Sequence, residues 1–233
     1  MMGDPRAEEI AANVAQVRER IAAAAKAAGR DPDELTLVGI TKTFPVEDAR
    51  RLVALGVTDL GENRDQDARV KAHEVPEARW HFVGRLQRNK AGSVASYADV
   101  VQSVDRPELV RALANGVRRA GRDPLDVLVQ VSIDGDPDRG GAPAGEVVPL
   151  ADAAASTGLL RPAGVMAVAP IDADPDAAFA ALAGIAATLR EAHPGATVIS
   201  AGMSGDLEAA VRNGATHLRI GTALLGGRPP LRR

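Results

Sequence analysis

A lysine directly after a short apolar run is the residue in this sequence best placed to do chemistry. Residues 37–40 have the composition of a buried strand. Pro45 ends the extended segment, because proline lacks an amide N–H and fixes φ. Lys42 lies between them. A lysine at the carboxyl end of a parallel strand would face the mouth of an α/β fold, where such folds hold their ligands.

An amine in that position has two interpretations. Apolar neighbours would lower the pKa of Lys42, because burial disfavours the charged form. A neutral amine can then attack an aldehyde and form a Schiff base. In the alternative interpretation, the side chain reaches the rim of the fold, keeps its charge in water and has no chemical role. Position alone leaves both interpretations open.

Two later segments have residues suited to an anion. Ser204 is expected just before a helix, where its hydroxyl and free backbone N–H groups would point the same way. Gly221 and Thr222 form a second expected turn with a hydroxyl, and loops at this stage of a barrel frequently bind phosphate. The alternatives are a simple helix cap and an ordinary turn. Together with Lys42, these residues suggest a phosphorylated aldehyde as ligand.

Arg219 falls inside a predicted strand. Its guanidinium is always charged and costly to bury without a partner. That partner could be an acidic side chain, such as Asp206 or Glu62, or an acceptor on a bound ligand. Burial requires a partner without identifying it.

Four more residues at predicted strand ends complete the expected site. Asn63 could bind a ring hydroxyl of a ligand or satisfy the backbone of a turn. His81 is expected to be a packed, hydrogen-bonded imidazole and not a catalyst. Met166 lies near the end of the sixth predicted strand, and Met203 follows the seventh. His217 shares a strand face with Arg219 by alternation, and the sequence assigns it no role.

These residues depend on alternating strands and helices to bring them together. Strands are expected at residues 37–40, 58–63, 80–84, 100–104, 126–133, 162–168, 197–200 and 217–221. Helices are expected between them, and two begin with an Asp-Pro pair, at Asp4 and Asp174. The pattern predicts an α/β protein: a single (β/α)8 TIM-type barrel over residues 1–233, with an extra N-terminal helix. An open doubly wound sheet is the second possibility.

Composition excludes several classes of function. The chain has 233 residues and no cysteine, so a disulfide, a thiolate metal site and a cysteine nucleophile are excluded. A net charge of −3 gives no general attraction to nucleic acid or to anionic membranes. No spacing of His, Asp or Glu resembles a metal site, and no Ser-His-Asp set is visible. No apolar run is long enough to cross a bilayer, so a cytoplasmic protein is expected.

Several segments resemble the pyridoxal phosphate homeostasis protein family, the YggS-type proteins, in the same order over nearly the whole chain. They are Gly39-Ile40-Thr41-Lys42-Thr43, Gly61-Glu62-Asn63, the block from Trp80 to Lys90, Gly164-Val165-Met166-Ala167, Gly202-Met203-Ser204-Gly205-Asp206 and Arg219-Ile220-Gly221-Thr222-Ala223. The sequence departs from the family pattern at Thr41, where serine is usual, and at Arg64, where tyrosine is usual. It departs again at Asp138-Arg139-Gly140-Gly141, where a lysine usually precedes the glycine.

The resemblance implies a barrel related to alanine racemase that binds pyridoxal 5′-phosphate (PLP) as an internal aldimine on Lys42. It implies phosphate contacts at Ser204, Gly221 and Thr222, with Arg219 near the pyridine nitrogen or the phosphate. The implied function is intracellular PLP homeostasis without turnover. PLP itself and apo forms of PLP enzymes are the expected partners, and the expected state is a monomer or weak homodimer.

The alternative is a PLP-dependent racemase or decarboxylase of the same barrel type. A racemase of this type resembles a two-domain protein whose second domain supplies a tyrosine or cysteine acid/base. Eleven residues follow Thr222, and the single tyrosine, Tyr97, lies outside the predicted strand ends. A third possibility is a class I aldolase, which would need a second acid/base beside Lys42. The sequence therefore favours a carrier over an enzyme.

Overall fold

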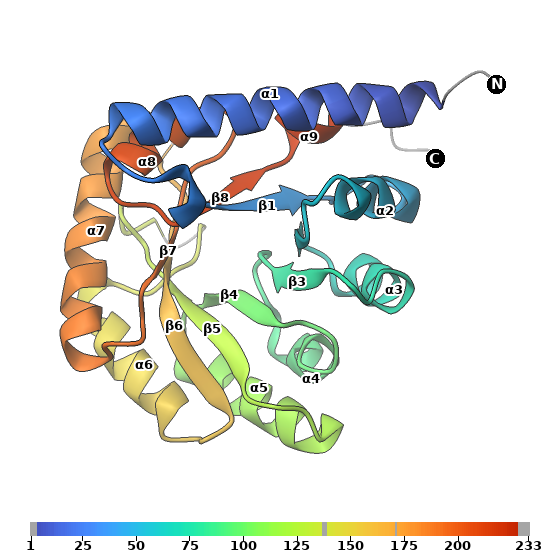
Figure 1. The fold of residues 1–233 in the computed structure, drawn as a ribbon. Coiled ribbons are helices and arrows are strands. Elements are labelled where there is room, and N and C mark those ends of the chain that lie inside the picture. Colours follow the sequence, from blue (N-terminus) through green and yellow to red (C-terminus); the bar gives the residue numbers. More distant parts are fainter. Residues whose placement is uncertain (1–3, 137–138, 171, 228–233) are drawn as a thin grey trace.

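Eight parallel strands close into a barrel in the computed structural model, which describes residues 4–136, 139–170 and 172–227. The strands follow one another in chain order around the barrel, and the last pairs with the first (Figure 1). They are β1 (Thr36–Ile40), β2 (Asp59–Glu62), β3 (Arg79–Phe82), β4 (Val100–Val104), β5 (Leu125–Gln130), β6 (Leu160–Met166), β7 (Val198–Ser200) and β8 (His217–Ile220). This confirms the predicted (β/α)8 barrel and excludes the open sheet.

Helices connect the strands and cover the outside of the barrel (Figure 1). They are α1 (Pro5–Ala27), α2 (Val46–Ala54), α3 (Asp65–Glu74), α4 (Ala91–Val94), α5 (Pro107–Ala120), α6 (Val147–Ala155), α7 (Pro175–Ala192), α8 (Leu207–Arg212) and α9 (Thr222–Leu225). Short 3-10 turns occur at η1 (Pro32–Glu34), η2 (Arg88–Lys90) and η3 (Ala144–Glu146). Asp138, the first residue of the divergent Asp138-Arg139-Gly140-Gly141 motif, lies outside the described residues.

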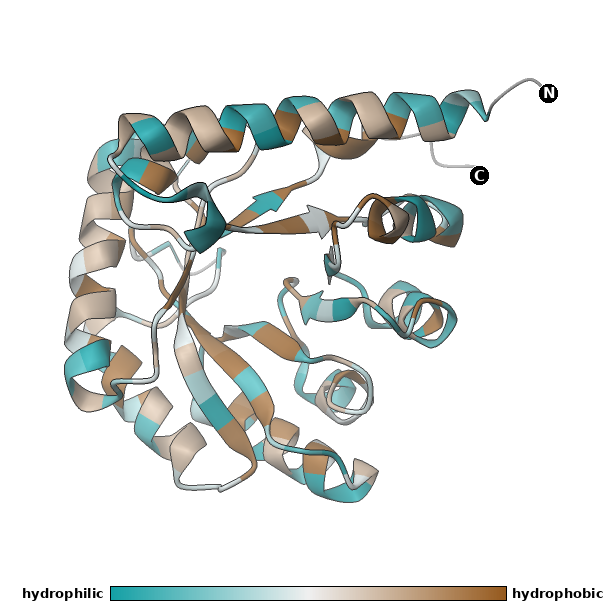
Figure 2. Cartoon of the chain, in the orientation of Figure 1, coloured by the Kyte–Doolittle hydropathy of each residue, from teal (hydrophilic) through white to brown (hydrophobic). Residues whose placement is uncertain are grey.

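The main apolar core lies between the outer face of the sheet and the helices, as expected for parallel strands covered on both sides. In Figure 2 the hydrophobic colour concentrates on the strands and on the helix faces toward them. A smaller apolar cluster of Val100, Leu128 and Met166 is separate from this core. Val100 shares a strand face with Gln102, which is buried and polar. The barrel interior therefore combines a small apolar cluster with polar side chains.

Helix α1 is the predicted additional N-terminal helix, and it packs along α8, α9 and α2 (Figure 1). It begins as expected, because the Asp4 side chain accepts a hydrogen bond from the Arg6 amide. Four residues at helical spacing, Ile10, Val14, Val17 and Ile21, form its buried face. This apolar stripe fixes α1 across the connections that follow β7 and β8.

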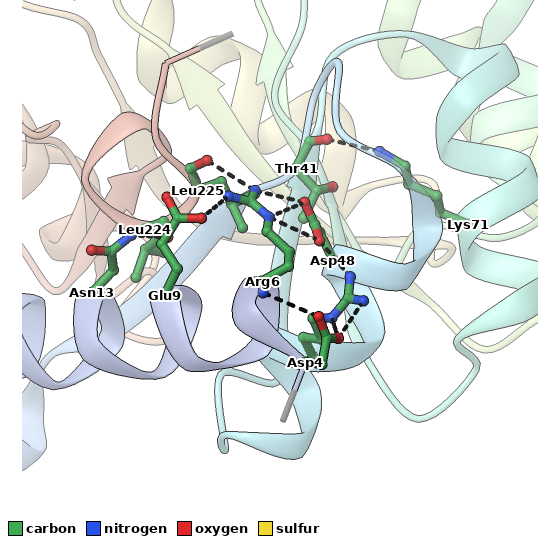
Figure 3. A network of polar contacts seen from close by, with 10 residues as sticks. Asp4, Arg6, Glu9, Asn13, Thr41, Asp48, Lys71, Leu224 and Leu225 are labelled. Atoms are coloured by element: carbon green, nitrogen blue, oxygen red, sulfur yellow. Dashed lines mark hydrogen bonds and ion pairs between the residues drawn. The ribbon is translucent and has the colours of Figure 1, made fainter. Parts of the chain in front are cut away.

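Polar contacts join α1 to the end of the described chain (Figure 3). Arg6 pairs with the buried Asp48 of α2 at 2.7 Å and donates to the carbonyl of Leu225 at 2.9 Å. Asn13 donates to the carbonyl of Leu224 at 3.0 Å. These bonds satisfy carbonyl groups that a four-residue helix leaves without intrahelical partners. Helix α1 thus holds α9 in place beside the barrel mouth.

We expect Gly164→Ala to lower the free energy of unfolding by about 3 kcal/mol or more. Gly164 has φ 152°, and an added Cβ would lie 1.9 Å from the carbonyl oxygen of Val198 on β7. The neighbouring strand would have to move, since this oxygen belongs to the backbone. Urea unfolding followed by circular dichroism measures the change.

Gly184→Ala is the matched control, because Gly184 lies inside α7 and an added Cβ would meet nothing within 4 Å. This change should raise stability by about 0.5–1 kcal/mol, since alanine favours the helix. Equal stability of the two variants would contradict the close approach of β6 and β7 at Gly164.

Candidate functional site

A cavity of about 340 Å³ opens at the carboxyl ends of β1, β6, β7 and β8. Seven of the nine predicted site residues line it: Lys42, Met166, Met203, Ser204, Arg219, Gly221 and Thr222. Ile40, Phe44, Val83 and Val168 add apolar wall. The volume is within the range of small-molecule and cofactor sites, about 300–1,000 Å³. The barrel therefore brings the predicted amine and the predicted anion-binding residues to one cavity.

Lys42 lies two residues beyond the end of β1, in a tight turn. The Thr41 amide donates to the carbonyl of Gly61 at 3.0 Å, and the Phe44 amide donates to the carbonyl of Thr41 at 3.1 Å. Thr43 has φ 72°, an unusual conformation for a β-branched residue. Such a residue persists only where its surroundings enforce it. The turn therefore holds the backbone of Lys42 in a defined position beside the cavity.

A buried ion pair supports the turn that contains Lys42. Lys71 of α3 and Glu62 of β2 are 5% and 0% exposed, and Lys71 Nζ lies 2.5 Å from Glu62 Oε1. Lys71 also donates to the carbonyl of Thr41 at 2.8 Å, as drawn in Figure 3. The Thr41 hydroxyl donates to Glu62 at 2.9 Å. The residue before Lys42 is thus bonded to both members of the pair.

Ser204 connects the loops that follow β7 and β8. Its hydroxyl accepts a hydrogen bond from the Ala223 amide at 3.4 Å, and its carbonyl accepts one from Arg20 of α1 at 2.7 Å. Ser204 lies shortly before α8, as expected, but the alternative that it is a simple helix cap is wrong. Helix α8 begins at Leu207 with Asp206 at the N-cap position, because Asp206 accepts from the Met203 amide and closes an intervening turn.

Arg219 is 6% exposed, and its guanidinium donates to Ser200 Oγ and to the carbonyl of Ala167, both at 2.8 Å. Burial lowers its pKa to about 10, so it remains charged at neutral pH. Within the described chain neither acidic partner considered from the sequence forms an ion pair with it. Glu62 binds Lys71 instead, and Asp206 caps the turn at Met203. A buried cation held by neutral acceptors is suited to a negatively polarised ligand atom.

Asn63 and His81 are not among the residues that line this cavity. Asn63 follows β2, where its carbonyl lies so close to Gly84 that a Cβ there would be 2.3 Å from it. His81 lies deeper in the barrel, 1% exposed, between Asp59 and Gln102. The expected packed, hydrogen-bonded imidazole is confirmed. Burial lowers the pKa of its neighbour His217 to about 4, so His217 is neutral at neutral pH.

A larger hollow of about 630 Å³ lies at the opposite, amino end of β3, β5 and β6. Five of its charged residues form ion pairs with one another: Arg79 and Arg161 pair with Asp126, and Arg122 pairs with Asp99. None of the predicted site residues lines this hollow. The cavity beside Lys42 is the stronger candidate despite its smaller volume.

Neither a metal site nor a membrane span is found among the described residues. Over the described ranges, no group of three or more His, Cys, Asp or Glu side chains could hold a metal ion. No helix in that part of the chain is long and apolar enough to cross a membrane.

Comparison with known proteins gives consistent matches over nearly the full chain. Residues 6–229 match the family model described as the alanine racemase N-terminal domain. The pyridoxal phosphate homeostasis protein of Corynebacterium glutamicum is 41% identical over 219 residues, which cover 91% of this chain and 99% of that protein. The protein of the same name from Mycobacterium tuberculosis is 42% identical over 245 residues, which cover 96% of this chain and 94% of that protein.

A solved structure agrees with these matches. PipY of Synechococcus elongatus, solved with PLP bound, superposes with a TM-score of 0.80 at 30% sequence identity, covering 93% of this chain and 100% of PipY. Sequence similarity, the family model and the fold all lead to the same group. The chain belongs to the pyridoxal phosphate homeostasis protein family, within the alanine racemase N-terminal domain fold.

Proposed function

We propose that this protein binds PLP in the cavity beside Lys42, holds it as a Schiff base and contributes to intracellular PLP homeostasis without turning over a substrate. The observation that carries the proposal is one cavity lined by a lysine, a buried arginine and a turn with hydroxyl groups. PLP presents an aldehyde, a ring nitrogen and a phosphate, which these three features match in kind. The 30% identity to PipY, a PLP-bound relative, supports the same ligand.

Each group of the chain has a distinct part in this proposal. The Lys42 amine adds to the aldehyde carbon, and water leaves as the C=N bond forms. Ser204 and Thr222 offer hydroxyl groups to the phosphate, and Gly221, which lies between β8 and Thr222, lines the same cavity. A side chain at position 221 would crowd the cavity wall, because an added Cβ would lie 3.3 Å from Ile40 Cβ. Met166 and Met203 supply apolar, polarisable contacts for the ring.

Arg219 favours the carrier over the racemase or decarboxylase. PLP acts as an electron sink in amino-acid chemistry, and its protonated ring nitrogen strengthens that sink. A charged guanidinium beside the nitrogen disfavours the protonated form, since two positive charges would face each other. Among the described lining residues, Lys42 and Arg219 are the ones with ionisable side chains. Tyr97 lies elsewhere, and burial raises the pKa of its hydroxyl.

We expect a monomer or weak homodimer that exchanges PLP with apo enzymes in the cytoplasm. Val168 and Met203 at the cavity are 40% exposed, so the ligand edge near them would be accessible from outside.

Lys42→Ala should abolish covalent PLP attachment. Wild-type protein incubated with PLP and reduced with borohydride should gain the mass of one pyridoxyl phosphate group, located on the peptide that contains Lys42. Peptide mass spectrometry measures both. Lys90→Ala is the control, because Lys90 is a lysine near Asp65 and outside the cavity. An adduct on another lysine in wild-type protein would contradict the assignment.

Incubation with L- and D-amino acids should give no sustained racemisation or decarboxylation, since the described residues that line the cavity supply no second acid/base. Chiral chromatography and amine detection measure both reactions, with an alanine racemase as positive control. Continued turnover that disappears in Lys42→Ala would replace the carrier proposal with the enzyme alternative.

Lys71→Met should lower the free energy of unfolding by about 3–5 kcal/mol, because it leaves Glu62 buried without its cation. It should also weaken PLP binding, since the Thr41 carbonyl keeps the Phe44 amide as a donor but loses the Lys71 amine. Denaturant unfolding and PLP titration measure the two effects. The double variant Glu62→Gln/Lys71→Met removes both charges and should recover part of the stability. Wild-type stability of Lys71→Met would refute this support for the turn.

A further inference from the structure

A continuous chain of hydrogen bonds crosses the barrel interior from the cavity toward the amino ends of the strands. Arg219 Nη1 lies 2.8 Å from Ser200 Oγ, and Ser200 Oγ lies 2.7 Å from Gln102 Oε1. Gln102 Nε2 lies 2.9 Å from His81 Nδ1, and His81 Nε2 lies 2.8 Å from Asp59 Oδ1. Five side chains from β8, β7, β4, β3 and β2 are therefore linked in series.

Each of the first four side chains donates to the next, and the Asp59 carboxylate accepts the last hydrogen bond. Arginine can only donate, so Ser200 Oγ accepts from it and directs its own hydrogen to Gln102 Oε1. The Gln102 amide nitrogen then donates to His81 Nδ1. His81 must accept there and donate through Nε2–H to the Asp59 carboxylate. The chain thus defines a neutral His81 with its proton on Nε2.

The opposite orientation of the Gln102 amide is less favourable. Its oxygen would face His81 Nδ1, which would then need a proton in addition to the one on Nε2. Its nitrogen would face Ser200 Oγ, leaving the hydroxyl hydrogen without an acceptor. Ser200 and Gln102 are both 0% exposed, so water cannot replace that bond. With all the bonds donated from Arg219 toward Asp59, each of the five side chains has a hydrogen-bond partner.

This series of hydrogen bonds joins two opposite charges, those of Arg219 and Asp59, that are too far apart to form an ion pair. Arg219 has no carboxylate within ion-pair distance in the described part of the protein, and it is buried. Asp59 begins β2 at the other end, where its side chain is 19% exposed. Burial alone would raise the pKa of Asp59, but the hydrogen bond from His81 and the positive charge of Arg79 hold the pKa below its usual value. The series of hydrogen bonds therefore ends at the ionised carboxylate of Asp59.

We propose that Ser200, Gln102, His81 and Asp59 form a positioning relay that orients the Arg219 guanidinium toward the bound cofactor. The relay and the Ala167 carbonyl occupy one N–H group on each terminal nitrogen, which leaves the others for a ligand in the cavity. The proposal rests on PLP as the ligand. It further implies that changes at the amino end of the barrel alter binding at the carboxyl end.

The first test uses apo protein and does not depend on the cofactor. ¹⁵N NMR of the histidine rings at pH 7 should show His81, assigned by its absence in His81→Gln, as the Nε2–H tautomer. Gln102→Leu removes the donor to Nδ1 and should change the Nδ1 resonance. An imidazolium or an Nδ1–H tautomer in the wild-type protein would overturn the relay, whether or not PLP binds.

The second test measures PLP affinity and the absorption spectrum of the bound cofactor. Ser200→Ala should raise the Kd about tenfold, as loss of a hydrogen bond to the charged Arg219 implies. Gln102→Leu should raise the Kd in the same direction, because it removes the acceptor of the Ser200 hydroxyl. Both changes should shift the absorption band. Ser103→Ala is the matched control on β4, because the Ser103 hydroxyl is buried without a partner among the described residues. It should leave both values unchanged.

A double-mutant comparison separates positioning from general damage. In an Arg219→Met background, Ser200→Ala should change the Kd by less than about twofold, because the relay acts through Arg219. Asp59→Asn keeps an acceptor for His81 and disturbs packing least, so it serves if the buried variants fail to fold. Asp59→Asn removes the negative charge at the end of the relay, so it should also raise the Kd for PLP. Wild-type affinity and spectrum in Ser200→Ala, Gln102→Leu or folded Asp59→Asn would overturn the relay while leaving the proposed function intact.

Discussion

The buried positive charge of Arg219 is the constraint on which the cavity depends. A guanidinium removed from water needs acceptors for its N–H groups and some compensation for its charge. Here the acceptors are a hydroxyl and a carbonyl, both neutral. A carboxylate at the same distance would stabilise the charge more strongly, but it would also remove the attraction for a ligand. The protein therefore keeps a charged group beside its cavity that is held firmly and not neutralised locally.

The surroundings of the cavity are fixed by contacts made far from it. Helix α1 contacts the Ser204 loop through Arg20 and the end of α9 through Arg6 and Asn13. The Glu62–Lys71 pair holds the turn before Lys42. Each contact fixes a loop at the carboxyl end of the barrel, where the connections would otherwise be free to move. Rigid loops bind a ligand at a smaller cost in conformational entropy, which suits a protein that holds a cofactor.

The sequence predicted the fold and most of the cavity for a simple reason. Parallel strands with regular alternation bring their carboxyl ends to one face, so residues at strand ends meet there. That rule succeeded for Lys42 and Arg219, which line the cavity. It failed for His81, which is the penultimate residue of β3, as Arg219 is of β8, but points into a deeper layer of the barrel. Depth within a barrel depends on stagger between strands, and a single sequence gives no signal for it.

Lys71 and Ser200 show a second limit of sequence reasoning. Lys71 lies on a charged helix, where a lysine normally reaches solvent, and only the packing of α3 against β2 reveals its buried partner. Ser200 was recognised as the end of a strand, but its importance arises from Arg219 on the neighbouring strand. Pairing of β7 and β8 places Ser200 opposite His217, and Arg219 follows two residues later on the same face. Long-range pairs of this kind define what the cavity can do, because they decide which charges are satisfied inside the protein and which stay available to a ligand.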